Sequence, residues 1–291
     1  MAAKVDFQTF DLDGQVHDLM WCGFNDETIL MHTTDGTIYR SRDRGLSWKR
    51  LKNLLQKQAN QVADEMQEIG GVHRMIQSPN DDQLVVFLGT NGINWVSEDC
   101  GANVKALNSG KRILEFLYHP TQRNWALAAS WTSCAEFVDE PCRIYKELYY
   151  TKDLGENWNY MTNYVFDFEW GQSPSAVAEA INIPDDRVWV TRDAKNTNHQ
   201  SHSKRLSWSV DIDLYYSDDY FENSVMALEQ GNTIIKTPQY MFVSCSHDDE
   251  RRVKIYSSTF RSGFKNLKKV RLPEDAMMTT TFTLMDTSED Q

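Results

Sequence analysis

The chain has 291 residues and a formal net charge of -12 at pH 7, and 41% of its residues are hydrophobic. This apolar content can bury the core of one large all-β domain or of two ordinary domains. The acidic balance argues against nucleic acid as a partner, because contact with a phosphate backbone needs a basic face. The first residues lack the apolar core of a signal peptide, and no stretch approaches the about 20 apolar residues of a membrane span.

Short strands joined by tight turns open the chain. Residues 16–22 and 28–33 are apolar enough for strands, and Asp35-Gly36 is typical of a hairpin turn. Residues 37–40 lead into Ser41-Arg42-Asp43-Arg44-Gly45-Leu46-Ser47-Trp48, which has the Asp-box form Ser/Thr-x-Asp-x-Gly-x-x-Trp. In such a turn the carboxylate can accept backbone N–H groups, and glycine permits a left-handed backbone. We expect the aromatic residue to start the return strand and to pack between neighbouring sheets.

An amphipathic pattern interrupts the strands at residues 52–69. Leu55, Ala59, Val62, Met66 and Ile69 recur at three- and four-residue spacing. The pattern predicts an inserted helix over 52–69 on the rim of the sheet structure, ended by two glycines. A helix that binds a partner is the alternative.

The Asp-box recurs along the chain with progressive loss. The second copy has Val104 in the aromatic position, the third is complete, and the fourth keeps only its Ser and Asp. The fifth is reduced to Ser257, Thr259 and Phe264 at the same spacing. The box residues are Ser41, Asp43, Gly45, Trp48, Ser97, Asp99, Gly101, Thr151, Asp153, Gly155, Trp158, Ser217 and Asp219. Because one copy falls in every unit, we interpret these aspartates as structural rather than catalytic.

The spacing of the boxes predicts an all-β fold, a β-propeller of four-stranded antiparallel blades. From Ser41 to Ser257 four intervals cover 216 residues, a mean of 54. Packed radially, such units leave only short, protected edges. The predicted blades are residues 14–70, 71–110, 111–163, 164–230 and 231–272, and a sixth begins at 273–291 with an inner strand at 279–286. We therefore expect about five and a half blades of a longer protein, with open edges that could self-associate.

Five cysteines are present, and only two suggest a pairing. Cys134 and Cys142 bracket a short polar loop that a disulfide could close, although two unrelated thiols are the equal alternative. The odd total leaves at least one cysteine without a partner in this chain. The sequence assigns no partner to Cys22, Cys100 or Cys245.

Several stretches together resemble the sortilin family of vacuolar protein sorting receptors. They are His119-Pro120, residues 125–128, the cysteine pair, residues 148–155 and the ordered boxes. The resemblance implies the first part of a ten-bladed propeller that binds protein or peptide cargo. Such receptors are type I membrane proteins that carry cargo between Golgi, endosome and vacuole or lysosome. It also implies the Golgi or endosomal lumen, with membrane attachment only through regions absent from this chain.

The resemblance further implies a ligand site on inner strands. An arginine that clamps a terminal carboxylate matches Arg252, with Arg251 one residue away, and Phe282 matches an aromatic lining residue. Ser244 is expected to lie across the hairpin from Arg252. The alternative is that both arginines are solvated charges of a turn.

Other chemistries find little support in the sequence. His199 and His202 lie in a polar loop without further ligands at metal spacing, so no metal is expected. No phosphate loop or nucleophile elbow occurs, and no cofactor is expected. A carbohydrate-active Asp-box propeller, either a glycosidase related to sialidases and xyloglucanases or a lectin, is the alternative to a non-enzymatic receptor. A glycosidase would need two facing carboxylates that the sequence does not single out.

Overall fold

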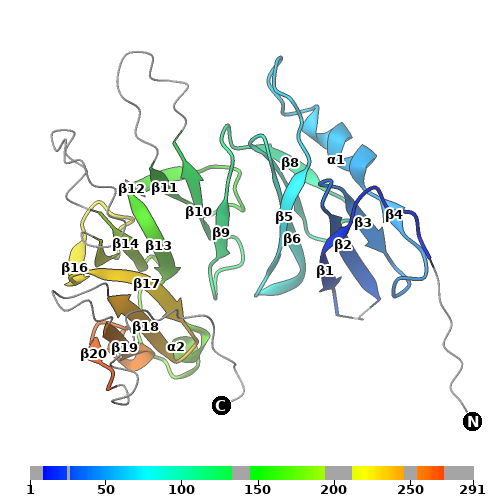
Figure 1. Ribbon diagram of the computed structural model, residues 1–291. Helices are drawn as coiled ribbons and strands as arrows, with labels where there is room; N and C mark the ends of the chain where they lie inside the picture. The colour runs from blue at the N-terminus through cyan, green and yellow to red at the C-terminus, as the bar shows by residue number, and fades with distance from the viewer. Residues whose placement is uncertain (1–8, 25–26, 133–144, 194–211, 246–253, 272–291) are drawn as a thin grey trace, which may run out of the picture. The chain divides into compact units, whose positions relative to one another are not determined.

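The computed structural model describes residues 9–24, 27–132, 145–193, 212–245 and 254–271. Within them the strands form five four-stranded sheets, and the strands of each sheet lie side by side in chain order (Figure 1). The predicted all-β fold of four-stranded antiparallel blades is confirmed. Each sheet falls inside one of the five ranges expected from the box spacing. The start of a sixth unit at 273–291 lies outside the described residues.

The strands, sheet by sheet, are β1 (Val16–Cys22), β2 (Thr28–Thr33), β3 (Ile38–Ser41) and β4 (Lys49–Arg50); β5 (Val72–Ser78), β6 (Asp81–Gly89), β7 (Ile93–Ser97) and β8 (Lys105–Asn108); β9 (Glu115–Tyr118), β10 (Ala126–Trp131), β11 (Lys146–Thr151) and β12 (Asn159–Asn163); β13 (Val165–Trp170), β14 (Val188–Arg192), β15 (Asp213–Ser217) and β16 (Val225–Leu228); β17 (Gly231–Lys236), β18 (Tyr240–Cys245), β19 (Lys254–Thr259) and β20 (Lys268–Lys269). The helical elements are α1 (Lys52–Ala59), α2 (Pro174–Ala178) and the 3-10 helix η3 (Phe260–Ser262). No helix in these segments has the length and apolarity to cross a membrane.

The chain divides into two compact units. Residues 1–118 and 151–158 form the first, and residues 119–150 and 159–291 form the second. In the first unit, apolar side chains of the first two sheets and of helix α1 share one core, which includes Leu30, Leu55 and Trp95. In the second unit, the fourth and fifth sheets share a core that includes Trp189, Met241 and Phe264. The inner strands β13 and β17 of these two sheets are neighbours.

Each sheet is tied to the next by a side chain that donates to a backbone carbonyl near the start of the next inner strand. In the first unit, His32 Nε2 lies 2.8 Å from the Val72 carbonyl oxygen, and His73 Nε2 lies 2.8 Å from that of Ile113. We call these contacts seam hydrogen bonds. In the second unit, the Lys146 ammonium donates to the Phe166 carbonyl and the Thr191 hydroxyl to that of Asn232, both at 2.6 Å. These bonds satisfy carbonyls that the strand ladder leaves available.

A β-bulge near the start of the inner strand supplies some of those carbonyls. The register shifts between the first and third residues of β1, β5, β13 and β17. Phe166 and Asn232 are the skipped residues of β13 and β17, so their carbonyls turn away from the regular ladder. The seam donors Lys146 and Thr191 use them. The bulge therefore recurs in four sheets, and in β13 and β17 it takes part in blade-to-blade packing.

The inserted helix is shorter than the sequence predicts. It begins at Lys52 but ends at Ala59, and residues 60–71 are turns and irregular chain. Val62 and Ile69 still pack against the core, whereas Met66 is 93% exposed. The apolar spacing is therefore produced by two different backbone conformations. Turn hydrogen bonds from the N–H groups of Val62 and Ala63 to the Ala59 carbonyl replace the continuing helix.

A disulfide joins Cys22 and Cys100, which the sequence left unassigned. Cys22 ends β1, Cys100 belongs to the second Asp-box, and 78 residues separate them. Cys245 is a buried free thiol. The predicted pair Cys134 and Cys142 lies outside the described residues. The bond closes a long loop and joins the first sheet to the second.

Replacing both Cys22 and Cys100 by Ser should lower the free energy of unfolding by about 2 to 4 kcal/mol, because a long closed loop restricts the unfolded chain. Chemical denaturation of the oxidised protein measures this. Reductant should destabilise the unaltered chain and a C134S/C142S control, but should have little further effect on C22S/C100S. Equal stability of C22S/C100S and the unaltered chain would contradict the prediction.

Candidate functional site

Four Asp-box turns share one hydrogen-bond pattern. In the first, the Ser41 hydroxyl donates to Asp43 Oδ1 over 2.7 Å and accepts the Gly45 N–H at 2.8 Å. The Ser47 N–H donates to Asp43 Oδ1 at 2.8 Å, and its hydroxyl donates to Oδ2. The other three turns repeat these bonds around Asp99, Asp153 and Asp219. The carboxylates are therefore occupied by their own turns.

Sequence reasoning missed one member of the turn. The residue four positions after each aspartate donates to it through both its N–H and its side chain. These residues are Ser47, Asn103, Asn157 and Asn223. Their shared ability to donate from a short side chain was a usable signal, since all four occupy the same place in the pattern.

The turn holds two successive residues in the left-handed region. In the first box these are Arg44 (φ 57°) and Gly45 (φ 89°). In the fourth box Phe221 takes the glycine position and still has φ 70°, while its N–H donates to the Ser217 hydroxyl at 2.9 Å. Such a backbone costs a bulky residue on the order of 1–3 kcal/mol. The hydroxyl and carboxylate therefore hold the turn even where glycine is absent.

The box tryptophans pack against their own turns. Trp48 and Trp158 are half-exposed and lie over the glycine of their own turn. A Cβ on Gly155 would come within 3.1 Å of the Trp158 ring. Trp158 also contacts Phe116 of β9, with ring centroids 6.2 Å apart. The aromatic residue thus covers the turn that precedes it.

The fifth turn has a different register from the expected Ser257 and Thr259 pattern. Its two left-handed residues are Gly263 (φ 61°) and Phe264 (φ 60°), directly after Ser262. The Ser262 hydroxyl lies 3.1 Å from that of Ser258 and accepts the Asn266 N–H at 3.4 Å. Ser262 therefore takes the place of the aspartate. Because helix η3 lengthens this turn, the two paired residues are Ser258 and Ser262 rather than residues two positions apart. The sequence spacing of the other boxes therefore does not reveal the match.

These hydrogen bonds lower the pKa of all four box carboxyls. For Asp43 and Asp219 the largest cause is the side chain four positions later. For Asp99 and Asp153 partial burial, the largest single influence, acts to raise the pKa, but the hydrogen bonds together outweigh it. Since the folded-state pKa lies below the unfolded value near 3.9, the ionised turns stabilise the fold above that pH. The contribution is lost as the pH falls through the folded-state pKa.

Asp219→Asn should lower the melting temperature at pH 7, because an amide nitrogen would then face the Asn223 amide donor. The difference from the unaltered chain should shrink as the pH falls below about 3.9 and through the lowered folded-state pKa of Asp219, where its carboxylate becomes protonated. Thermal unfolding followed by circular dichroism measures both. Glu222→Gln removes an exposed charge from the same turn and is the matched control. A pH-independent effect of Asp219→Asn would contradict this account of the turn.

Of the predicted ligand residues, only Ser244 lies within the described part of the chain. It is buried in β18, and Ile255 is its partner on β19. The expectation that Ser244 lies across the hairpin from Arg252 is therefore wrong. The register places Ile255, three residues after Arg252, opposite Ser244. Arg251, Arg252 and Phe282 lie outside the described residues.

Ser244 occupies a position that carries seam hydrogen bonds in other sheets. His32, Thr191 and Ser244 each pair with the inner-strand residue that follows the bulge. Thr191 accepts the Asp167 N–H at 3.0 Å and donates onward to the next sheet. Ser244 accepts the Thr233 N–H at 3.4 Å in the same way. The Ser244 hydroxyl therefore occupies the same place in its sheet as the Thr191 hydroxyl, which joins the fourth sheet to the fifth.

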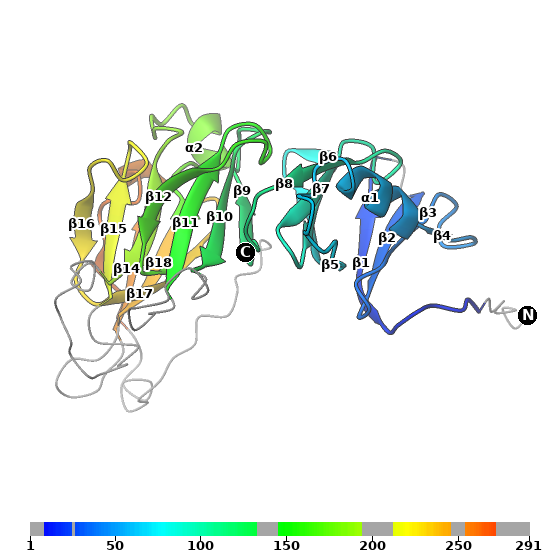
Figure 2. The ribbon, with the colours of Figure 1, turned by 90° about the horizontal axis from the view of Figure 1, so that it is seen from above.

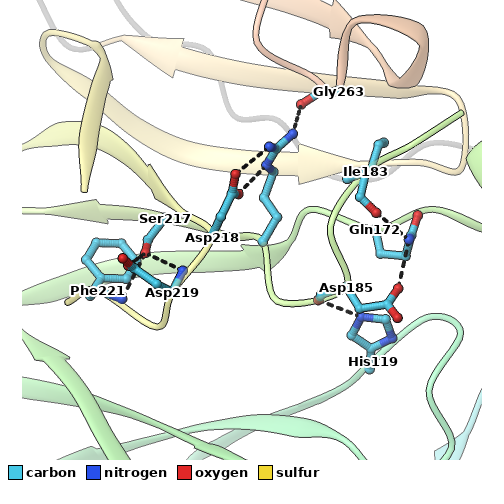
Figure 3. A network of polar contacts seen from close by, with 10 residues as sticks. His119, Gln172, Ile183, Asp185, Ser217, Asp218, Asp219, Phe221 and Gly263 are labelled. Carbon is cyan, nitrogen blue, oxygen red and sulfur yellow. Dashed lines mark hydrogen bonds and ion pairs between the residues drawn. The ribbon is translucent and has the colours of Figure 1, made fainter. Parts of the chain in front are cut away.

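His119, part of the sequence resemblance, belongs to a buried polar network (Figure 3). Its Nδ1 accepts the N–H groups of Thr121 and Gln122, so Nε2 carries the proton and donates to the Asp185 carbonyl at 3.1 Å. Burial, the largest cause, lowers the His119 pKa to about 4. The imidazole is therefore neutral and serves as a connector. The Asp185 carboxylate accepts from Gln172 at 2.9 Å and from Gln122 at 2.8 Å.

The Arg187 guanidinium donates to both oxygens of Asp218, at 2.6 and 2.7 Å, and to the Gly263 carbonyl at 3.4 Å (Figure 3). The Arg187 side chain is only 6% exposed. A buried guanidinium needs such complete pairing, so Arg187 is a packing residue and is unavailable to a ligand.

Two charged residues on neighbouring inner strands were not singled out from the sequence. Glu169 on β13 and Lys236 on β17 are half-buried and attract each other. Burial raises the Glu169 pKa from 4.5 to about 7, against the opposing effect of Lys236. Burial also lowers the Lys236 pKa, and Glu169 opposes that shift.

Among the described residues, no group of His, Cys, Asp or Glu side chains could hold a metal ion.

The raised pKa of Glu169 makes stability depend on pH. The folded chain retains this proton more strongly than the unfolded chain, so the contribution is complete below about pH 4.5 and is lost as the pH rises through about 7. We expect the stability of Glu169→Gln relative to the unaltered chain to rise by about 1–3 kcal/mol between pH 5 and pH 8. Urea unfolding at both pH values measures it. A constant difference would contradict the prediction, and Glu179→Gln is the exposed control.

Curated relatives of the chain are fungal proteins named vacuolar protein sorting/targeting protein 10. The protein from Ajellomyces capsulatus strain NAm1 / WU24 is 25% identical over 202 residues, covering 66% of this chain and 12% of the relative. That from Aspergillus clavatus is 22% identical over 274 residues, covering 91% and 16%. The chain thus spans less than a fifth of the length of either relative.

Solved structures with similar folds include an ancestral GH74 enzyme, with 14% identity, a TM-score of 0.46, and 88% of this chain and 31% of that chain covered. The tricorn protease has 9% identity and a TM-score of 0.49, covering 87% and 26%. A family model described as sortilin, neurotensin receptor 3, matches residues 36–291. The predicted kinship is confirmed: the chain belongs to the Sortilin-Vps10 family.

Proposed function

We propose that this chain is part of the luminal domain of a vacuolar sorting receptor. In this role it binds protein or peptide cargo, without altering it chemically, for transport from the Golgi to endosome and vacuole or lysosome. The observation that carries the proposal is the family match over residues 36–291, together with relatives named for vacuolar sorting. The occupation of the box carboxylates by their own turns agrees with a binding rather than a catalytic role.

The proposed cargo site contains Arg252 and Arg251, with Phe282 and Ser244. A guanidinium matches the two oxygens of a terminal carboxylate, so the arginines would select the end of a peptide. Phe282 would contact an apolar side chain beside that carboxylate. Ser244 lies near the end of β18, and both arginines come after it in the sequence, before β19 begins at Lys254.

Cargo peptides offered as matched pairs, with a free or an amidated C-terminus, test this site. Arg252→Ala should weaken binding of the free acid by about tenfold or more, because a charge-assisted hydrogen bond contributes about 1.5–3 kcal/mol. Arg261→Ala removes a 71% exposed side chain of the same sheet and is the control. Calorimetric titration measures the affinities. Equal binding of acid and amide would contradict a carboxylate clamp.

The variant Ser244→Ala separates two roles of that hydroxyl. A cargo contact would change affinity at constant melting temperature. A seam hydrogen bond would change the melting temperature while the folded chain keeps its affinity.

A further inference from the structure

The outer strands of the five sheets differ in how they protect their free edges. β4 (Lys49–Arg50) and β20 (Lys268–Lys269) are two exposed charged residues each. β8 begins with the exposed Lys105, and β12 begins and ends with Asn159 and Asn163. Short length and charge, lysine above all, discourage an edge from pairing with another chain. The outer strands β4, β8 and β20 carry such protection, whereas β12 has no charged side chain.

Strand β16 lacks this protection. It comprises Val225, Met226, Ala227 and Leu228, with no charged or polar side chain. Val225 is 52% exposed and Met226 48% exposed. β16 is the last strand of its sheet, and within the described residues no strand pairs with its outer side (Figures 1 and 2). Its outward N–H and C=O groups can therefore bond to an added strand.

A cavity of about 390 Å³ adjoins this edge. Met226, Ala227 and Leu228 form one side of it, and Cys245 and Tyr256 of the fifth sheet form another. Lys254 also lines the cavity. Glu229 and Gln230 complete a lining that mixes polar and apolar side chains. An added strand would thus find main-chain partners on β16 and a pocket for one of its side chains, the two elements of strand-addition recognition.

Charge distinguishes between two occupants of this edge. Exposed Glu222 and Glu229 lie just before and just after β16. Antiparallel pairing of β16 with a second copy would bring the acidic ends of both strands together, and each chain carries a net charge of -12. An apolar segment flanked by basic residues meets the glutamates with opposite charge instead.

We propose that the outer edge of β16 binds an extended apolar segment of a partner protein, flanked by basic residues, as a fifth strand of the fourth sheet. One side chain of the segment enters the adjoining cavity. The proposal rests on β16 and its cavity and does not depend on the proposed carboxylate clamp.

The probe is a fluorescent, end-blocked peptide, Lys-Val-Thr-Val-Thr-Val-Lys, titrated with the full 291-residue chain. We expect saturable binding and slower amide hydrogen exchange at residues 225–228. Val225→Lys with Met226→Lys should weaken binding by about tenfold or more, since this restores edge protection. Tyr160→Lys, which adds one lysine to the exposed outer strand β12, should leave binding unchanged. Methylation of alternate peptide nitrogens should abolish it, because these N–H groups bond to the edge.

Several results would overturn the proposal. They are absence of binding, equal loss in Tyr160→Lys and the β16 double variant, or full binding by the methylated peptide. A chain that dimerises in sedimentation, and becomes monomeric in the double variant, would assign the edge to a second copy instead. Circular dichroism of each variant establishes that the fold is intact. The clamp variant Arg252→Ala should bind this probe normally, so failure here and failure of the proposed function are distinguishable.

Discussion

The structure depends on the hydrogen bond between a buried Ser or Thr hydroxyl and an aspartate carboxylate two residues later. This pair accepts several N–H groups of one turn and holds two consecutive residues at positive φ. The turn reverses the chain between the third and fourth strands and fixes where the fourth strand begins. Phe221 shows how strong the constraint is, because it adopts φ 70° where glycine would do so freely.

Seam hydrogen bonds then order one sheet against the next. The donors are chemically different, two histidines, a lysine and a threonine, yet each reaches a carbonyl at the start of the next inner strand. Apolar contact alone would allow sheets to slide, whereas a buried donor and acceptor specify one arrangement. Polar side chains inside the seams therefore already use their hydrogen-bonding groups within the fold. The same holds for His119 and Arg187.

The sequence predicted the features that repeat locally. Strand number, blade size and turn chemistry follow from hydrophobic runs and from the box spacing, which depend on neighbouring residues. Contacts between distant residues were not predictable in this way, and the Cys22–Cys100 bond across 78 residues is the clearest case. The helix predicted over 52–69 was too long, because Val62 and Ile69 lie in turns and irregular chain and still pack their apolar side chains against the core. The raised pKa of Glu169 likewise arises from burial beside another sheet.

Committing polar groups to turns and seams restricts where recognition can occur. A box carboxylate or a seam histidine cannot bind a ligand without loss of a hydrogen bond that orders the fold. Inner-strand side chains outside the seams and the free main-chain groups of outer strands do not carry this cost. Lysine or arginine protects the outer strands β4, β8 and β20. The apolar β16 lacks such a residue, and its outer main-chain groups can bind a partner without loss of a hydrogen bond that orders the fold. In a repeat fold, departure from the repeated solution is therefore the physical signal for a binding surface.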